Sequence, residues 1–176
     1  MATTSTSANS GIDICSRALI LIGANPITSF DDGTTESTVA VNLYEDIARS
    51  ALTNTRWRFA TEQAILNTLS DVPTGRWDMA SQLPSDLLML HGVTINDILV
   101  DYQLYGNKVF SNQTSADVMI ADYTYRADEI DWPSYFTLAV EYSIAVVFAT
   151  AIARDAPLAT LMQTLAERSM AKARNL

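Results

Sequence analysis

The sequence has very little of the side-chain chemistry on which most catalytic and metal sites depend. Among its 176 residues there is one cysteine, Cys15, and one histidine, His91. A single cysteine excludes an internal disulfide and a cysteine-based metal cluster. A single histidine leaves a catalytic triad or a histidine metal site without its other members. The motifs GxSxG, HExxH, GxGxxG, CxxC and the P-loop do not occur. We therefore expect a protein that is not an enzyme, with no cofactor and no bound metal.

Positive charge is also scarce. The chain has 11 Lys and Arg against 20 Asp and Glu, which gives a net charge of -9 and a pI near 4.4. Such a balance argues against sequence-specific binding of nucleic acid and against anionic membranes. Residues 154–176 are the exception, with four basic and two acidic groups (+2), which leaves -11 for the rest. A basic segment of this kind is typical either of docking on an acidic surface or of cations that stabilise a helix C-terminus.

The remaining polar groups that could carry chemistry have simpler interpretations. Cys15 lies in an apolar helical pattern, which predicts a buried thiol. His91 follows an apolar run typical of a strand, which predicts a structural or surface residue. The neighbouring carboxylates fall in turns and helix caps, with Asp131 as the expected cap of the helix that follows it. These carboxylates are Asp31 and Asp32, and then Asp128, Glu129 and Asp131. A small acidic hydrolase that uses the second group is the enzymatic alternative.

Apolar residues at spacings of three and four predict four helices. We expect them over residues 11–23, 35–55, about 133–153 and 157–174. Gly23 and Pro26 end the first, and Pro157 separates the last two. Thr34 or Thr35 is the expected cap of the second helix and Asp155 that of the fourth.

Between the second and third helices the pattern changes. Short strand-like runs follow one another at 87–95, 98–106, 108–112 and 118–126, and Gly106-Asn107 is a hairpin signal. These patterns therefore predict a small antiparallel β insertion over residues 57–126. The expected fold class is mainly α, with a four-helix bundle-like core and this insertion between helices two and three.

Two segments bear on domain limits and on membranes. Residues 1–10 are small and polar, without the basic and apolar regions of a signal peptide, and we expect a flexible N-terminal arm. We expect residues 11–176 to form a single domain.

Residues 135–153 have about the length of a membrane span. They contain Glu141, and a buried helix is the better interpretation, with no membrane partner.

The one unusual concentration of side chains is "TRWRF". Trp57 and Phe59 are expected to close the second helix as core residues, with Arg56 and Arg58 on the opposite side, where they can pair with an acidic neighbour. Tryptophan and arginine are also common anchors of protein–protein interfaces, and this alternative stays open.

Four stretches occur in a particular order: "ICSRALILIGANPITSFDDGTTES", "AVNLYEDIARSALTNTRWRFAT", "LPSDLLML" and "WPSYFTLAVEYSIAVVFATAIA". Together they resemble the head–tail adaptor family of tailed bacteriophages, of the tail tubular protein A type. The resemblance covers roughly residues 11–170 and assigns structural rather than catalytic positions. These positions are Gly23, Pro26, Trp57, Phe59, Leu83, Pro84 and Asp86.

The resemblance implies a structural virion protein. Such adaptors form a dodecameric ring beneath the portal protein, receive a tail nozzle or tube protein on the other face, and let double-stranded DNA pass through the lumen. They lie in the neck or tail of the virion and in the host cytoplasm during assembly. The expected portal-docking residues are Arg168, Lys172, Arg174 and Leu176. A different neck component, such as a stopper below the adaptor, and a binding module that forms no ring are the alternatives.

Overall fold

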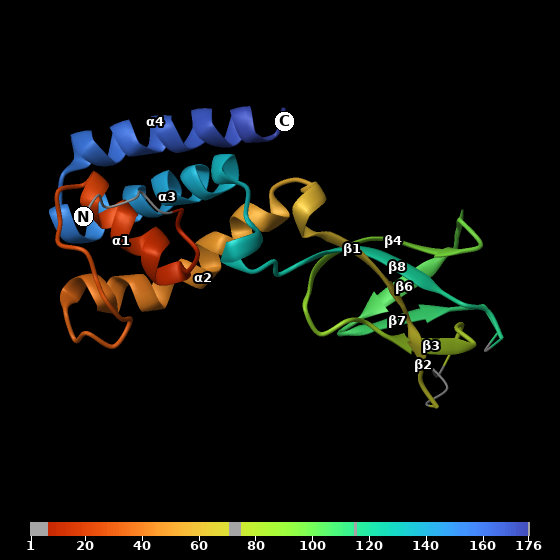
Figure 1. Ribbon diagram of the computed structural model, residues 1–176. Coiled ribbons are helices and arrows are strands. Elements are labelled where there is room, and N and C mark those ends of the chain that lie inside the picture. Colours follow the sequence, from red (N-terminus) through yellow and green to blue (C-terminus); the bar gives the residue numbers. More distant parts are fainter. Residues whose placement is uncertain (1–6, 71–74, 115, 176) are drawn as a thin grey trace, which may run out of the picture. The chain divides into compact units, whose positions relative to one another are not determined.

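A computed structural model describes residues 7–70, 75–114 and 116–175. The chain forms two compact units, and each has its own interior (Figure 1). The helical unit consists of Met1–Thr55 and Ala127–Leu176, and the β unit is Arg56–Arg126. Of the expected arm over residues 1–10, residues 1–6 lie outside the described part of the chain. The side chain of Ala8 is buried, and Ser10 caps the first helix.

The described part of the helical unit consists of four α-helices and two short helical turns. They are α1 (Gly11–Leu21), α2 (Thr35–Thr53), η2 (Glu129–Asp131), α3 (Ser134–Phe148), the π-helical turn η3 (Ala149–Ala153) and α4 (Ala156–Ala173). Thr34 caps α2 and Asp155 caps α4, each by accepting a hydrogen bond from a backbone N–H three residues on, as predicted. The expected cap at Asp131 is wrong, because Pro133 occupies that position before α3.

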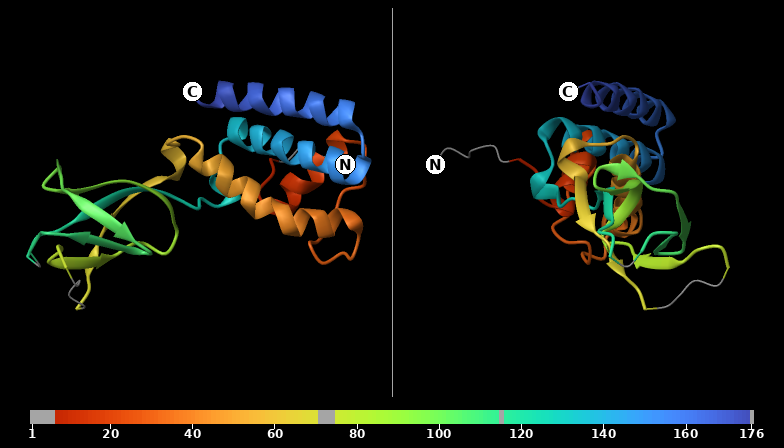
Figure 2. Two further views of the ribbon diagram at one scale, coloured as in Figure 1. Left: turned by 180° about the vertical axis from the view of Figure 1, so that it is seen from behind. Right: turned by 90° about the vertical axis from the view of Figure 1, so that its right-hand side faces the viewer.

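Helix α3 is the centre of the helical unit, and it packs against α1, α2 and α4. Figure 1 shows α1 in front of α3, and Figure 2 shows the same helices from behind. Phe136, Ile144 and Phe148 are fully enclosed by these neighbours. Over Ser134–Ala153 the chain is long and apolar enough to cross a membrane by length and composition. Half of that stretch is buried within the protein, and the core helix of a soluble protein passes the same test.

The described residues of the β unit form two four-stranded sheets, and each strand pairing among them is antiparallel. The first has the order β1-β8-β4-β5 and the second the order β2-β3-β7-β6. The strands are β1 (Thr61–Ile65), β2 (Asn67–Thr68), β3 (Met79–Gln82), β4 (Leu87–Ile95), β5 (Ile98–Leu99), β6 (Tyr102–Tyr105), β7 (Lys108–Ser111) and β8 (Ile120–Tyr125); a 3-10 turn, η1 (Arg58–Ala60), precedes β1. The predicted hairpin is confirmed, because Tyr105 pairs with Lys108 across Gly106-Asn107, and Gly106 has a φ of 60°.

Apolar side chains from both sheets meet in one core inside the β unit. Its buried members are Leu66, Met79, Leu83, Val93, Val109, Met119 and Ala121. Four of these residues come from strands, and Leu66, Leu83 and Met119 come from positions directly beside strand ends.

The expectation of a mainly α fold, with a four-helix bundle-like core and a small β insertion, is wrong. About 45% of the described residues are helical and about 22% are in strands. The strands form two complete sheets with a core of their own, so residues 56–126 are a structural unit rather than an appendage. Strands β1, β2 and β3 lie within the predicted β segment 57–126, but their individual positions could not be predicted because most of their residues are polar. Pairing with distant strands, rather than local pattern, holds them in place.

Candidate functional site

The groups with titratable chemistry are dispersed over the described residues. No three His, Cys, Asp or Glu side chains there are close enough together to hold a metal ion. His91 lies on β4, with its Nε2 atom 2.8 Å from Oγ1 of Thr124. Burial, assisted by the positive charge of Arg56, lowers the pKa of His91. Cys15 is fully buried as predicted, and burial raises the pKa of its thiol to about 12.

One carboxylate of each acidic stretch, Asp32 and Glu129, accepts hydrogen bonds from nearby groups. Asp32 accepts hydrogen bonds from the backbone N–H groups of Thr28 (2.7 Å) and Ser29 (3.1 Å), which lower its pKa. Glu129 accepts a hydrogen bond of 2.7 Å from the hydroxyl of Tyr44. These contacts confirm Asp32 as a turn residue and attach the turn before α3 to helix α2.

Residues assigned by the resemblance occupy structural positions in both units. Gly23 follows α1 with a φ of +75°, a conformation that L side chains rarely adopt. Leu83 is buried in the β unit. The backbone carbonyl of Asp86 accepts a hydrogen bond from Arg126 N–H (3.2 Å), which ties the turn before β4 to the end of β8. Pro84 contributes to the same turn, since its carbonyl accepts from the N–H of Leu87 (3.4 Å).

The Trp-x-Phe pair lies at the start of the β unit. Trp57 is buried, and its ring lies 5.9 Å from that of the half-buried Phe59. The carbonyl of Phe59 accepts a hydrogen bond from the hydroxyl of Tyr125, and Arg56 forms an ion pair with Asp122 at 3.7 Å. The core interpretation of Trp57 is confirmed, as is the pairing of an adjacent arginine with a carboxylate.

The expected docking residues of the C-terminal helix do not form one cluster. The buried face of α4 carries Met162, Ala166, Met170 and Ala173. Arg168 and Lys172 are exposed and, four residues apart, share one face of the helix. Arg174 instead donates a hydrogen bond of 2.6 Å from its Nη2 atom to Oδ1 of Asn54, at the end of α2. Leu176 lies outside the described residues.

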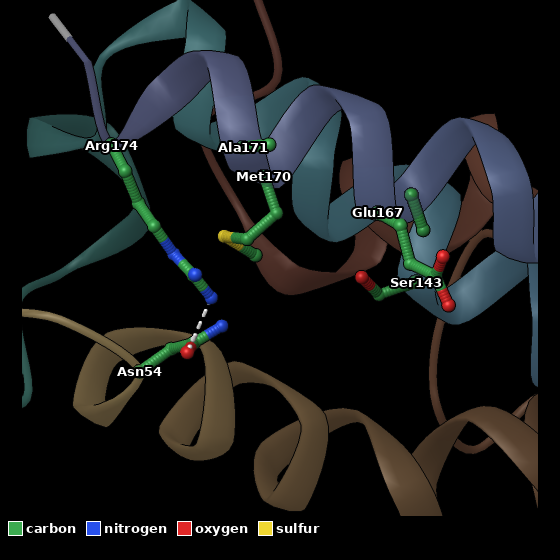
Figure 3. A pocket seen from close by; sticks show the side chains of 7 residues that line it. Asn54, Ser143, Glu167, Met170, Ala171 and Arg174 are labelled. Atoms are coloured by element: carbon green, nitrogen blue, oxygen red, sulfur yellow. Dashed lines mark hydrogen bonds between the residues drawn. The ribbon is translucent and has the colours of Figure 1, made fainter.

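A groove runs over α3 between α2 and α4, and we call it the α2–α4 groove. It consists of two adjoining hollows of about 410 and 310 Å³ that share Asn54, Ser143 and Met170. The larger hollow is lined mainly by the apolar side chains of Leu43, Ile47, Ala51, Val147 and Met170. Figure 3 shows the smaller one, with Arg174 and Glu167 at its opposite ends. The α2–α4 groove is therefore a largely apolar hollow with charged side chains at its rim.

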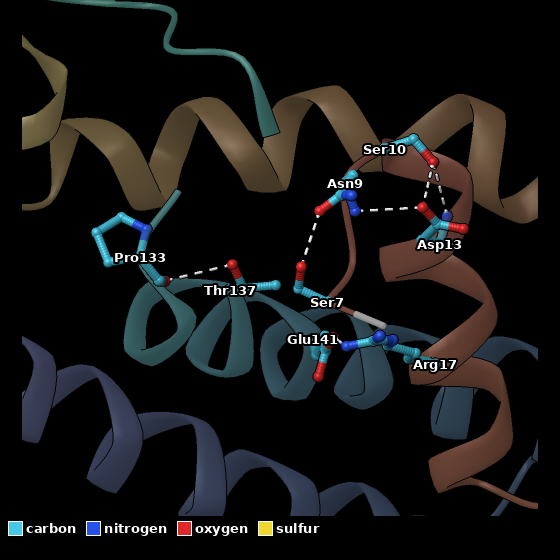
Figure 4. Close-up of polar contacts among 8 residues, drawn as sticks. All are labelled: Ser7, Asn9, Ser10, Asp13, Arg17, Pro133, Thr137 and Glu141. Carbon is cyan, nitrogen blue, oxygen red and sulfur yellow. Dashed lines mark hydrogen bonds and ion pairs between the residues drawn. The ribbon is translucent and has the colours of Figure 1, made fainter. Parts of the chain in front are cut away.

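An ion pair between the buried Glu141 and the partly exposed Arg17 joins α3 to α1. Glu141 is only 6% exposed, and its Oε1 atom lies 3.5 Å from Nη1 of Arg17 (Figure 4). Burial raises the pKa of Glu141, and the charge of Arg17 opposes that rise. Because 3.5 Å is long for a charge-assisted hydrogen bond, the pair links α1 to α3 without fully compensating the loss of hydration.

Sequence reasoning missed the α2–α4 groove altogether. Leu43 and Ile47 follow the helical spacing of apolar residues in α2, yet both are only half-buried, and they line the groove. The groove forms because α2 and α4 both pack on α3 and leave a space between themselves. No local sequence pattern indicates such a space.

Comparison with known proteins identifies the family of the chain. A search of curated proteins found no match. The family model described as tail tubular protein matches residues 12–173, which is nearly the whole chain and spans both units. The chain therefore belongs to the tail tubular protein family, whose members are structural components of bacteriophage tails.

Proposed function

We propose that the chain is the head-to-tail adaptor of a tailed bacteriophage. In this function, copies form a ring beneath the portal protein, a nozzle or tube protein binds the opposite face, and DNA passes through the lumen. Family membership over residues 12–173 is the observation that carries the proposal. The ring, its dodecameric size and the portal are inferred from the resemblance of the ordered motifs.

The charge distribution supports a passage for DNA. The chain as a whole carries -9, and most of its basic groups are dispersed singly. A wall of this sign repels phosphate groups, so a duplex can move past it without binding tightly.

The exposed face of α4 is the proposed contact with the portal. Arg168 and Lys172 lie on it, and Leu161, which is 53% exposed, precedes them by about two and three helical turns. Since α4 packs closely on α3 through Met162 and Met170, the whole helix cannot be removed without exposing the core. Charge changes on its outer face are therefore the appropriate test.

Binding of the protein to a portal ring of the same phage, measured by biolayer interferometry, tests this contact. The double variant Arg168→Glu, Lys172→Glu should bind roughly tenfold or more weakly, because two complementary charges become repulsive. The matched control is Arg58→Glu, Arg76→Glu, which changes net charge equally at exposed positions of the β unit. Equal weakening in both variants would contradict a specific contact at α4. Undiminished binding of the Arg168→Glu, Lys172→Glu variant would show that α4 does not contact the portal through these residues.

A further inference from the structure

One large apolar side chain of the helical unit is presented to solvent between two carboxylates. Ile130, on the turn η2, is 68% exposed, and Asp128 and Asp131 beside it are exposed as well. Leu138, in the first part of α3, is 43% exposed and lines the same surface hollow as Ile130. We call residues 128–131 the Ile130 turn.

The Ile130 turn is held firmly from both ends. Glu129 Oε1 accepts the 2.7 Å hydrogen bond from Tyr44, which fixes the turn to α2. On the other side Trp132 is buried, and its Nε1–H donates to the carbonyl of Ala127 at 3.0 Å. Its ring meets that of Phe136 edge-on at 4.9 Å. A side chain presented on a fixed turn loses little conformational entropy on binding, which is what an interface anchor requires.

The α2–α4 groove offers an apolar hollow and, at one end, a single positive charge against two carboxylates elsewhere in its lining. Its larger hollow of about 410 Å³ is apolar and large enough for a side chain such as isoleucine together with a neighbour. Arg174 lies at one end, already positioned by Asn54, where it can receive a carboxylate. The carboxylates of Asp46 and Glu167 also line the groove, so a second acidic group is admitted only at the Arg174 end.

The turn and the groove are on opposite faces of α3. Leu138, beside the turn, and Val147, in the groove, are nine residues apart, which is about 2.5 turns of an α-helix. A copy cannot fill its own groove with its own turn from that position. A contact between unlike surfaces of two copies is head-to-tail, and repeating it around an axis closes a ring.

We propose that the Ile130 turn of one copy seats in the α2–α4 groove of the next copy. Ile130 enters the apolar hollow between Ile47 and Met170, and Asp131 pairs with Arg174. This inference rests on the proposed ring, and it names the surfaces through which neighbouring subunits of that ring meet.

Cross-linking of two full-length variants tests the contact directly. Ile130→Cys and Ile47→Cys proteins are mixed and treated with a short bismaleimide, alone and in the presence of the portal ring. The native Cys15 is fully buried and does not contribute. The matched control pairs Ile47→Cys with Ile98→Cys, because Ile98 is an isoleucine of the β unit with nearly the same exposure, 71%.

The 130–47 pair should give roughly tenfold more covalent dimer than the 98–47 control. Adding Arg174→Asp to the groove copy should reduce that yield roughly tenfold, and adding Asp131→Arg to the turn copy should restore it. If electron microscopy shows rings but the 130–47 pair cross-links no better than the control, the inference is overturned and the proposed ring is not. Absence of both rings and cross-links would overturn the inference together with the proposed function.

Discussion

Removing the hydroxyl group of Tyr44 should loosen the turn that carries Ile130 while leaving the helices intact. In Tyr44→Phe the ring stays in place, including its contact with Phe30 at 6.1 Å. What is lost is the 2.7 Å hydrogen bond to the carboxylate of Glu129. This substitution therefore separates the attachment of the turn from the packing of α2.

The size of the effect follows from the kind of bond. A hydrogen bond to a charged group contributes about 1.5–3 kcal/mol, and this one is only partly buried, so we expect the low end, about 1.5 kcal/mol. For a cooperative unit of roughly 100 residues, each kcal/mol lowers Tm by about 4–8 °C. The melting temperature of the helical unit should therefore fall by roughly 6–12 °C.

Thermal unfolding followed by circular dichroism at 222 nm measures this change. The matched control is Tyr105→Phe, the same chemical change at an exposed residue of β6, which should stay within about 0.5 kcal/mol of the parent. A double-mutant cycle with Glu129→Gln should give a coupling energy of about 1 kcal/mol. Coupling below about 0.3 kcal/mol would refute the assignment of this bond as the attachment of the turn.

Three further changes test the backbone conformation at Gly23, the core of the β unit and the buried carboxylate. Gly23→Ala should cost about 1 kcal/mol in chemical denaturation, because φ is +75° while no atom lies within 4 Å of the added Cβ; an unchanged midpoint would contradict the backbone argument. Met119→Ala, at a residue 1% exposed in the β unit, should cost about 2–5 kcal/mol. Tryptophan fluorescence should show the loss while the 222 nm transition of the helices stays in place, and a joint loss would mean that the units do not unfold separately. Burial raises the pKa of Glu141, so the folded chain holds that proton more tightly than the unfolded chain. Stability should therefore fall as pH rises from about 4.5 through the raised pKa. Glu141→Gln should lack this fall and melt higher than the parent at pH 7, and a lower Tm would show that the ion pair with Arg17 outweighs burial.

The helices were predictable from the sequence because the signals that determine them are local. The stripe of apolar residues, the cap at Thr34 and the stop at Gly23 all lie within a few residues of the feature that they determine. The hairpin at Gly106-Asn107 and the nine-residue strand β4 were predictable for the same reason.

The sheets and the candidate contact surfaces depend on distant partners. The run over residues 98–106 looked like a single strand, yet β5 pairs with β4 in one sheet and β6 with β7 in the other. Arg174 was predicted to dock on a partner protein, and its hydrogen bond to Asn54 joins residues 120 positions apart. The α2–α4 groove likewise arises from the way three helices pack, which the apolar stripes alone do not specify.

Cryo-electron microscopy of the protein alone and mixed with the portal ring of the same phage tests the adaptor function most directly. The account predicts a ring of this chain beneath the portal, with the outer face of α4 against the portal and the Ile130 turn of each copy in the groove of its neighbour. Single separate subunits in both samples, with portal rings that carry no added density, would contradict it.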